Sequence, residues 1–174
     1  MIRRLRAYGN AAVSEISKIP LRYMFWAVLY SFIINLLDET MMNGGFVEGM
    51  RTHFWAGFSA DKFFFMNGLF ILFITLSILI YERRGGAWVT FPLFWSIERT
   101  FNGFWHVWWT LSFLSYSPGL VTSGLFWIIT YLLVKENYRQ GDFTRRQLLT
   151  ATGAAFIFEC LFLGLILVVP LLGV

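Results

Sequence analysis

Acidic, amide and imidazole side chains interrupt the long apolar segments of this sequence. The acids are Asp38, Glu39, Glu98 and Glu159, and His106 lies among them. A charged side chain at the centre of a membrane-spanning helix costs about 2.5 to 3.5 kcal/mol even on the mildest scale, so such groups must face inward, pair with one another or remain protonated. A protonated acid in apolar surroundings is a proton donor, so acid–base chemistry is the first function to consider.

The third apolar segment carries the most informative pattern. Its polar and aromatic residues recur at spacings that place them on one face of a helix. These residues are Trp95, Glu98, Asn102, Trp105, His106 and Trp109. Tryptophan faces can stabilise a cation, so this face combines a proton donor with a place for a carbocation. Arg99 is rotated by about 100° from Glu98, and we expect it to meet a carboxylate on a neighbouring helix.

The first hypothesis is a membrane-embedded enzyme that protonates an isoprenoid or sterol-like lipid and guides its isomerisation or cyclisation. The predicted catalytic residues are Asp38, Glu39, Glu98, His106 and Glu159. The predicted substrate-binding residues are Asn35, Asn67, Trp95, Asn102, Trp105, Trp109 and Tyr116. This hypothesis requires that acids from separate helices surround a shared hollow with apolar walls.

Two other classes of function remain open. His106 and the carboxyl groups around it could bind a divalent metal such as iron, manganese or zinc, since these metals accept imidazole and carboxylate ligands. Helical carboxylate metal sites usually contain a Glu-x-x-His pair, which this sequence lacks. Alternatively, the chain is a non-catalytic subunit or a lipid- or pigment-binding protein, as a homo-oligomer or within a larger membrane complex.

The composition excludes a water-soluble globular protein. Of the 174 residues, 57% are apolar, 20% are aromatic and 14% are charged, whereas soluble domains contain about 25% charged residues. The net charge of +4 does not indicate nucleic-acid binding, because lysine and arginine cluster at the ends of apolar runs, as in membrane proteins. The single cysteine, Cys160, excludes an internal disulfide framework.

Five apolar stretches are long enough for helices that cross ~30 Å of hydrocarbon. They cover residues 20–41, 62–81, 87–112, 118–135 and 147–172. The short connectors at residues 82–86 and 115–117 require the third helix to pack antiparallel against the second and the fourth. The predicted fold is therefore an all-α, integral membrane five-helix bundle, which forms a single domain over residues 20–174.

The distribution of basic residues predicts the orientation of this bundle. Lysine and arginine gather before the first span, at residues 83–84 and at residues 135–146, and none lies between the third and fourth spans or after the fifth. The positive-inside rule places the N-terminus in the cytoplasm and the C-terminus outside, as in a bacterial inner membrane. Residues 1–19 mix basic and apolar residues at helical spacing, which predicts an amphipathic helix on the cytoplasmic leaflet.

Three short elements occur in a recognisable order. They are Asn35-Leu36-Leu37-Asp38-Glu39, Asn102-Gly103-Phe104-Trp105-His106 and Tyr116-Ser117-Pro118-Gly119-Leu120-Val121-Thr122. They resemble the HxxEE, NxxxH and YxPGxxT elements of the HXXEE family of small bacterial membrane proteins, with Asn35 where the family has His and Asp38 where it has the first Glu. The resemblance implies a helical membrane architecture more than an activity, and it leaves His106 alone among carboxylates.

Overall fold

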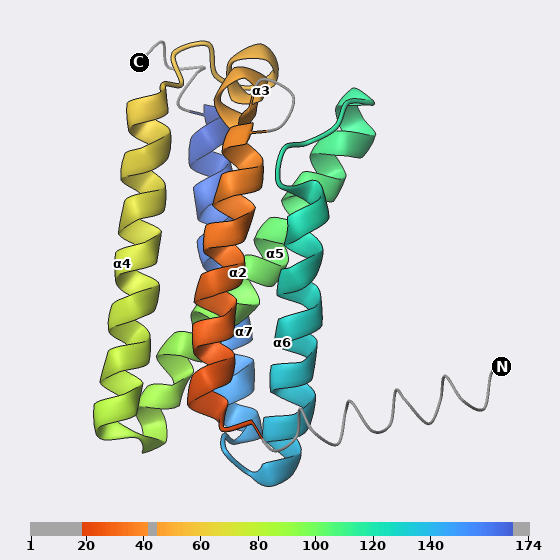
Figure 1. The fold of residues 1–174 in the computed structure, drawn as a ribbon. Helices are drawn as coiled ribbons and strands as arrows, with labels where there is room; N and C mark the ends of the chain where they lie inside the picture. Colours follow the sequence, from red (N-terminus) through yellow and green to blue (C-terminus); the bar gives the residue numbers. More distant parts are fainter. Residues whose placement is uncertain (1–18, 42–44, 169–174) are drawn as a thin grey trace, which may run out of the picture.

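The computed structural model describes residues 19–41 and 45–168, which form a bundle of helices (Figure 1). The helices are α2 (Leu21–Met41), α3 (Gly45–His53), α4 (Ala60–Arg84), the short 3-10 helix η1 (Gly86–Val89), α5 (Thr90–Phe113), α6 (Leu120–Gln140) and α7 (Arg145–Val168). No strand occurs in these two ranges, so the all-α prediction is confirmed. The predicted amphipathic segment falls on residues 1–18, outside the described residues.

Each predicted span coincides with one long helix, although the ends differ. The largest difference is at α6, which continues to Gln140 because Lys135 and Glu136 end the apolar run without ending the backbone hydrogen bonding. The helix ends where Gly141 adopts a left-handed φ of 80°. The prediction contains no counterpart of α3, which lies in the connection between the first two spans. Residues 169–172 of the last predicted span lie outside the described part of the chain.

Three helices of the described chain are long and apolar enough to cross a membrane. These are α2, α4 and α7. Helices α5 and α6, with 24 and 21 residues, have similar lengths but are less apolar. In α5 the difference comes from the polar residues that the sequence analysis singled out, including Glu98 and Arg99. The three apolar helices indicate that the chain is a membrane protein. The count of five membrane-spanning helices stays a prediction.

Helix α5 is the central element of the bundle. It runs obliquely from the base of α4 towards the top of α6 (Figure 1) and packs against α4, α6 and α7. Helix α2 packs against α4 and α6 and also contacts α5. A helix with neighbours on several sides is buried over most of its surface, which explains why the polar groups of α5 lie inside the protein.

Two clusters of buried apolar residues fill the bundle. The larger cluster joins all five long helices and includes Phe25, Phe32, Ile78, Leu93 and Phe126. The smaller cluster lies beneath α3 and contains Met50, Phe58, Phe63, Trp105, Trp109 and Ile166. Many large apolar side chains on the outer faces of the helices are exposed, as expected where lipid replaces water as the solvent.

Candidate functional site

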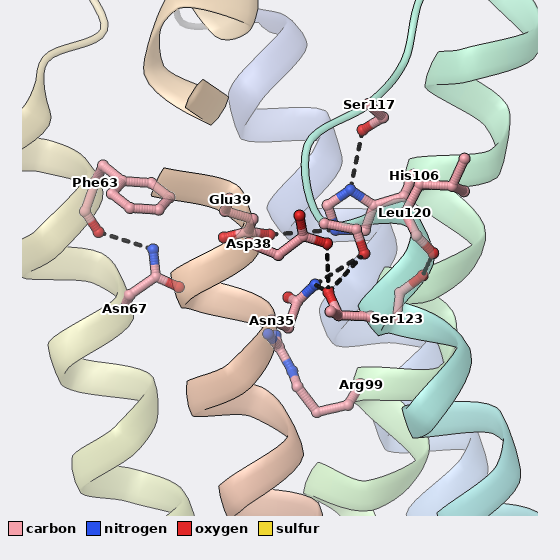
Figure 2. A network of polar contacts seen from close by, with 12 residues as sticks. Asn35, Asp38, Glu39, Phe63, Asn67, Arg99, His106, Ser117, Leu120 and Ser123 are labelled. Atoms are coloured by element: carbon pink, nitrogen blue, oxygen red, sulfur yellow. Dashed lines mark hydrogen bonds and ion pairs between the residues drawn. The ribbon is translucent and has the colours of Figure 1, made fainter. Parts of the chain in front are cut away.

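His106 of α5 joins two helices and a connecting loop through its ring nitrogens (Figure 2). Its Nδ1 lies 3.0 Å from the Ser117 hydroxyl, which comes from the connection between α5 and α6. Its Nε2 lies 3.2 Å from Oε1 of Glu39 in α2. The Glu39 carboxylate is therefore an ion-pair neighbour of Nε2 without a hydrogen bond to it, whereas Nδ1 shares a hydrogen bond with the Ser117 hydroxyl. Both His106 and Ser117 are completely buried, so this chain of polar groups is sealed from solvent.

A second set of hydrogen bonds holds α2 against the start of α6. Asn35 Nδ2 donates to the Gly119 carbonyl at 2.9 Å and to Thr122 Oγ1 at 3.0 Å. The Thr122 hydroxyl donates to Asp38 Oδ2 at 2.9 Å. Gly119 allows this close approach, because it has a left-handed φ of 94° and carries no side chain. Asn35 and Asp38 therefore position the loop that carries Ser117.

Tyr116 lies in the same loop, outside the long helices, and is half-buried. Burial raises the pKa of its hydroxyl above the ordinary value of 10.0, and the negative charge of Asp38 raises it further. Tyr116, which was predicted to bind the substrate, therefore lies beside Asp38, which was predicted to be catalytic. The neutral form of this tyrosine is therefore favoured in the folded protein.

We expect the substitution Asp38→Asn to lower the pKa of Tyr116 part of the way towards its ordinary value, because burial remains after the charge is removed. The pKa of Tyr116 is higher in the folded protein than in the unfolded chain, so its neutral form stabilises the folded state. This stabilisation is complete below pH ~10 and is lost as the pH rises through the folded-state pKa of Tyr116. Alkaline titration of tyrosinate absorbance measures the shift, with Tyr116→Phe identifying its signal. Asp61→Asn, which removes an exposed carboxylate from the start of α4, should leave the titration unchanged.

The second buried centre is an ion pair within α5. Arg99 donates to Glu98 through Nε and Nη2, each at 2.6 Å, and both side chains are buried. We expected Arg99 to pair with a carboxylate of another helix, and this prediction is wrong, because both hydrogen bonds of the guanidinium go to Glu98 of the same helix. The flexible side chains of adjacent residues turn towards each other, although their Cα–Cβ bonds diverge. The guanidinium also lies 4.5 Å from the Phe32 ring centroid and 5.1 Å from that of Phe70.

Glu159 of α7 is a buried acid whose carboxyl group lies close to that of Glu98. Its nearest charged neighbours are Glu98 and Arg99, with which it interacts electrostatically. Because the guanidinium is already engaged by both oxygens of Glu98, a second negative charge at Glu159 would be left without its own counterion. Charge balance therefore favours Glu159 as a neutral, protonated acid.

A small enclosed cavity lies between the two centres. Its polar lining residues are Glu39, Asn67, Arg99 and Asn102, and the other walls are apolar side chains from α3, α4 and α7. The volume is about 40 Å³, which is enough for roughly two or three water molecules. Such a space is too small for an isoprenoid. Glu39, Glu98 and Glu159 all interact electrostatically with Arg99, but the cavity that Glu39 and Arg99 line is not a hollow of lipid size.

A larger space lies on the outer surface between α5 and α7, and we call it the Glu159 groove. It has a volume of about 360 Å³ and opens at the surface of the bundle. It is lined by Phe101, Phe104, Trp105, Trp108, Phe156, Glu159, Cys160, Leu163 and Leu167. Glu159 is the carboxylic acid of this otherwise apolar and aromatic lining. A lipophilic molecule in the groove would lie against the Glu159 side chain, whose two carboxyl oxygens are themselves buried.

The remaining predicted binding residues are divided between different places. Trp105 lines the Glu159 groove, whereas Trp95 lines other grooves between α4 and α7. Trp109 is buried in the aromatic cluster under α3. Asn67 donates to the Phe63 carbonyl of its own helix at 2.9 Å, while its side chain borders the small cavity. The two tryptophans proposed to flank a single cation therefore lie in separate grooves.

Several residues of the site are absent from the prediction. Ser117 and Thr122 complete the His106 and Asp38 contacts, and Trp108 and Cys160 line the Glu159 groove. Ser117 and Thr122 stand within the Tyr116–Thr122 element, so that element was a usable signal. Trp108 and Cys160 carry no such signal, because outward-facing residues of a membrane helix look alike in sequence.

Metal binding finds little geometric support. In residues 19–41 and 45–168, no three His, Cys, Asp or Glu side chains are grouped so that they could hold a metal ion. His106 has Glu39 as its carboxylate neighbour. The metal-dependent alternative stays a prediction, which elemental analysis of the purified protein would test.

No family model, curated protein or solved structure matches this chain. The resemblance of residues 35–39, 102–106 and 116–122 to the HXXEE family therefore stays a prediction. Function is inferred here from the geometry and chemistry of the site.

Proposed function

We propose that the chain is an integral membrane protein with five spanning helices, its N-terminus in the cytoplasm and its C-terminus outside, in a bacterial inner membrane. The apolar character of α2, α4 and α7 supports this arrangement. Helices α4 and α6 end at the same side of the bundle (Figure 1). Basic residues lie near both of these ends, namely Arg83 and Arg84 in α4 and Lys135 in α6, in keeping with the positive-inside rule.

We propose further that the protein is an acid–base enzyme acting on a hydrophobic, isoprenoid- or sterol-like lipid. The observation that carries the proposal is Glu159, a buried acid beside the Glu98–Arg99 pair that lines an apolar groove of about 360 Å³. In the sequence-based hypothesis, Glu98 or Glu39 donates the proton. The geometry favours Glu159 as the donor, because Glu98 is bound to Arg99 and Glu39 lies against His106.

The proposed reaction is an isomerisation in which Glu159 acts as both acid and base. The carboxyl transfers its proton to one carbon of the substrate double bond, which leaves a carbocation at the other carbon and a carboxylate at Glu159. Trp105 and Trp108 line the groove, and in this scheme their aromatic rings stabilise the cation. The carboxylate then removes a different proton from a neighbouring carbon, which restores the acid and shifts the double bond.

Arg99 stabilises the charged intermediate in this scheme. Its guanidinium interacts electrostatically with Glu159 as well as with Glu98 and Glu39. The carboxylate that forms on proton donation shares this guanidinium with Glu98 until it recovers a proton from the substrate. Arg99 does not line the Glu159 groove, so it is a positioning residue and not a catalytic one.

Substitution of Glu159 by Gln tests the proposed reaction. We expect Glu159→Gln to abolish the lipid product found in extracts of cells that express the wild-type protein, as measured by mass spectrometry. Glu136→Gln is the matched control, since Glu136 is an equally buried glutamate of α6 that does not line the groove. Identical lipid profiles for wild type and Glu159→Gln would exclude Glu159 as the proton donor and would favour a non-catalytic lipid- or pigment-binding subunit.

The single cysteine provides a separate test of occupancy. Cys160 is exposed and lines the Glu159 groove. We expect a C15 or C20 isoprenoid alcohol to slow the reaction of Cys160 with a maleimide, because both occupy the same space. Glu159→Gln should keep this protection, since it changes the acid without filling the groove. Labelling that is unaffected by the isoprenoid would show that the groove does not bind it.

A further inference from the structure

A second groove runs along the opposite side of α7, between α7 and α4 and over the surface of α5. One part has a volume of about 510 Å³. Its lining residues are Phe73, Leu76, Ser77, Ile80, Thr90, Phe91, Phe94, Trp95, Thr150, Ala151 and Ala154. A further part of about 440 Å³ shares Phe73, Phe94 and Trp95 with the first. The two parts adjoin at these three residues, and together we call them the α4–α7 groove.

The length of the α4–α7 groove matches the tail of one lipid. Along α7 its lining extends from Thr150 to Phe162, which corresponds to about 18 Å of helix. One leaflet of a bilayer has a hydrocarbon thickness of about 15 Å. Its walls are almost wholly apolar, and the ring of Trp95 stacks parallel to that of Phe73 at a centroid distance of 6.4 Å. An extended acyl chain would fit along such a surface.

Four exposed arginines lie at the ends of the two helices that border this groove. Arg83 and Arg84 end α4, and Arg145 and Arg146 begin α7. Arg84 follows the groove residue Ile80 by four positions, and Arg146 precedes Thr150 by four, so each lies on the same helix face as a lining residue.

The two helix ends that carry these arginines are joined. Gln147 Nε2 donates to the Gly86 carbonyl at 3.3 Å, which ties the start of α7 to the turn after α4. The arginines of the two helices are thereby held around one opening. Thr90 and Thr150, which line the groove at this end, add two hydroxyl groups.

Within residues 19–41 and 45–168, the positive charge at this end is not neutralised by carboxylates. None of the four arginines forms an ion pair with a carboxylate in the described part of the chain. The adjacent acid, Glu82, accepts a hydrogen bond from Trp26 Nε1 at 2.9 Å. Arg84 lies 5.0 Å from the ring centroid of Trp88, which is half-buried. Aromatic and basic residues together are typical of the headgroup level of a membrane.

We propose that the α4–α7 groove binds one phospholipid with an anionic headgroup, its acyl chain lying along Phe73, Phe94 and Trp95. The headgroup phosphate then lies among the four arginines and accepts hydrogen bonds from Arg84 and Arg146, whose planar guanidinium groups suit phosphate oxygens. This site is separate from the Glu159 groove, which lies on the other side of α7, and it does not depend on the proposed reaction.

Native mass spectrometry of the full-length protein, titrated with phosphatidylglycerol or phosphatidylcholine in detergent, tests the headgroup. We expect wild type to retain one phosphatidylglycerol in preference to phosphatidylcholine. The double substitution Arg84→Gln with Arg146→Gln should weaken phosphatidylglycerol binding by roughly 30-fold. The matched control, Arg22→Gln with Arg139→Gln, removes the same charge from the same end of the bundle but away from the groove, and it should bind as wild type does.

A second variant tests the acyl chain without changing the charge. Ala154 is exposed in the groove, so Ala154→Phe fills it at little cost to the fold. We expect this variant to lose the bound phosphatidylglycerol, with all four arginines intact. If both double-arginine variants lost phosphatidylglycerol binding equally, the lipid would be attracted by the basic end of the bundle in general and not by the arginines next to the groove. Unchanged binding by Ala154→Phe would show that the tail lies elsewhere, and either result overturns the proposal.

Discussion

Substitution of Arg99 by Met should lower the free energy of unfolding by about 3 to 5 kcal/mol, the range seen when one partner of a buried ion pair is removed. Glu98 is completely buried and both its oxygens accept from Arg99 at 2.6 Å, so its negative charge would lose its counterion. Methionine keeps the length of the side chain and its contact with Phe32 and Phe70. Reversible unfolding in mixed detergent micelles measures the change.

Two further variants separate the charge from the packing. Glu98→Gln should destabilise the protein less than Arg99→Met, because Glu159 remains near the guanidinium as an alternative counterion. The double variant Glu98→Gln with Arg99→Met buries no unpaired charge and should recover part of the loss. If Arg99→Met alone unfolds at the wild-type denaturant concentration, the ion pair does not contribute to stability.

Gly119→Ala should have the second-largest effect, a destabilisation of about 2 to 5 kcal/mol. The left-handed backbone at φ 94° costs an alanine about 1 to 2 kcal/mol. Its methyl group would also lie 2.7 Å from Asn35 Nδ2, 2.8 Å from His106 Cε1 and 2.9 Å from Glu39 Cγ. Crowding of this kind in a packed interior costs a further 1 to 3 kcal/mol, roughly.

Gly141 provides the matched control for this substitution. It has a similar φ of 80°, but a Cβ atom there would meet no other atom within 4 Å. Gly141→Ala should therefore show only the backbone cost of about 1 to 2 kcal/mol. Thermal unfolding of both variants measures the difference. Equal losses in the two variants would show that Gly119 does not hold α6 tightly against His106 and Glu39.

The sequence predicts the helices well, because each apolar run is bounded by charged or turn-forming residues that the fold also uses. The periodic face of α5 predicts that Glu98 and His106 are buried, and both are. Short connectors correctly predict which helices are neighbours in the bundle, since the six-residue link between α5 and α6 keeps α6 beside α5. Periodicity and loop length are local properties, so they can be read without coordinates.

The partners of the buried groups could not be predicted in the same way. Helix geometry separates Glu98 from Arg99 by about 100°, so periodicity alone favours partners on different helices. Their actual pairing depends on side-chain rotamers and on the absence of a closer carboxylate oxygen for the guanidinium. Likewise, the Glu159 groove depends on how closely α5 and α7 approach one another. Neither property is encoded in the spacing of residues along one helix.

The pairing of Glu98 with Arg99 also has a consequence for how the protein is made. The two charges are consecutive residues of α5, so they can neutralise each other before any other helix has arrived. A newly synthesised α5 would then enter the bilayer carrying a compact zwitterion instead of two isolated ions that need later rescue. The most polar of the long apolar segments could in this way be integrated early, and the helices made after it would assemble around a centre whose charge is already balanced.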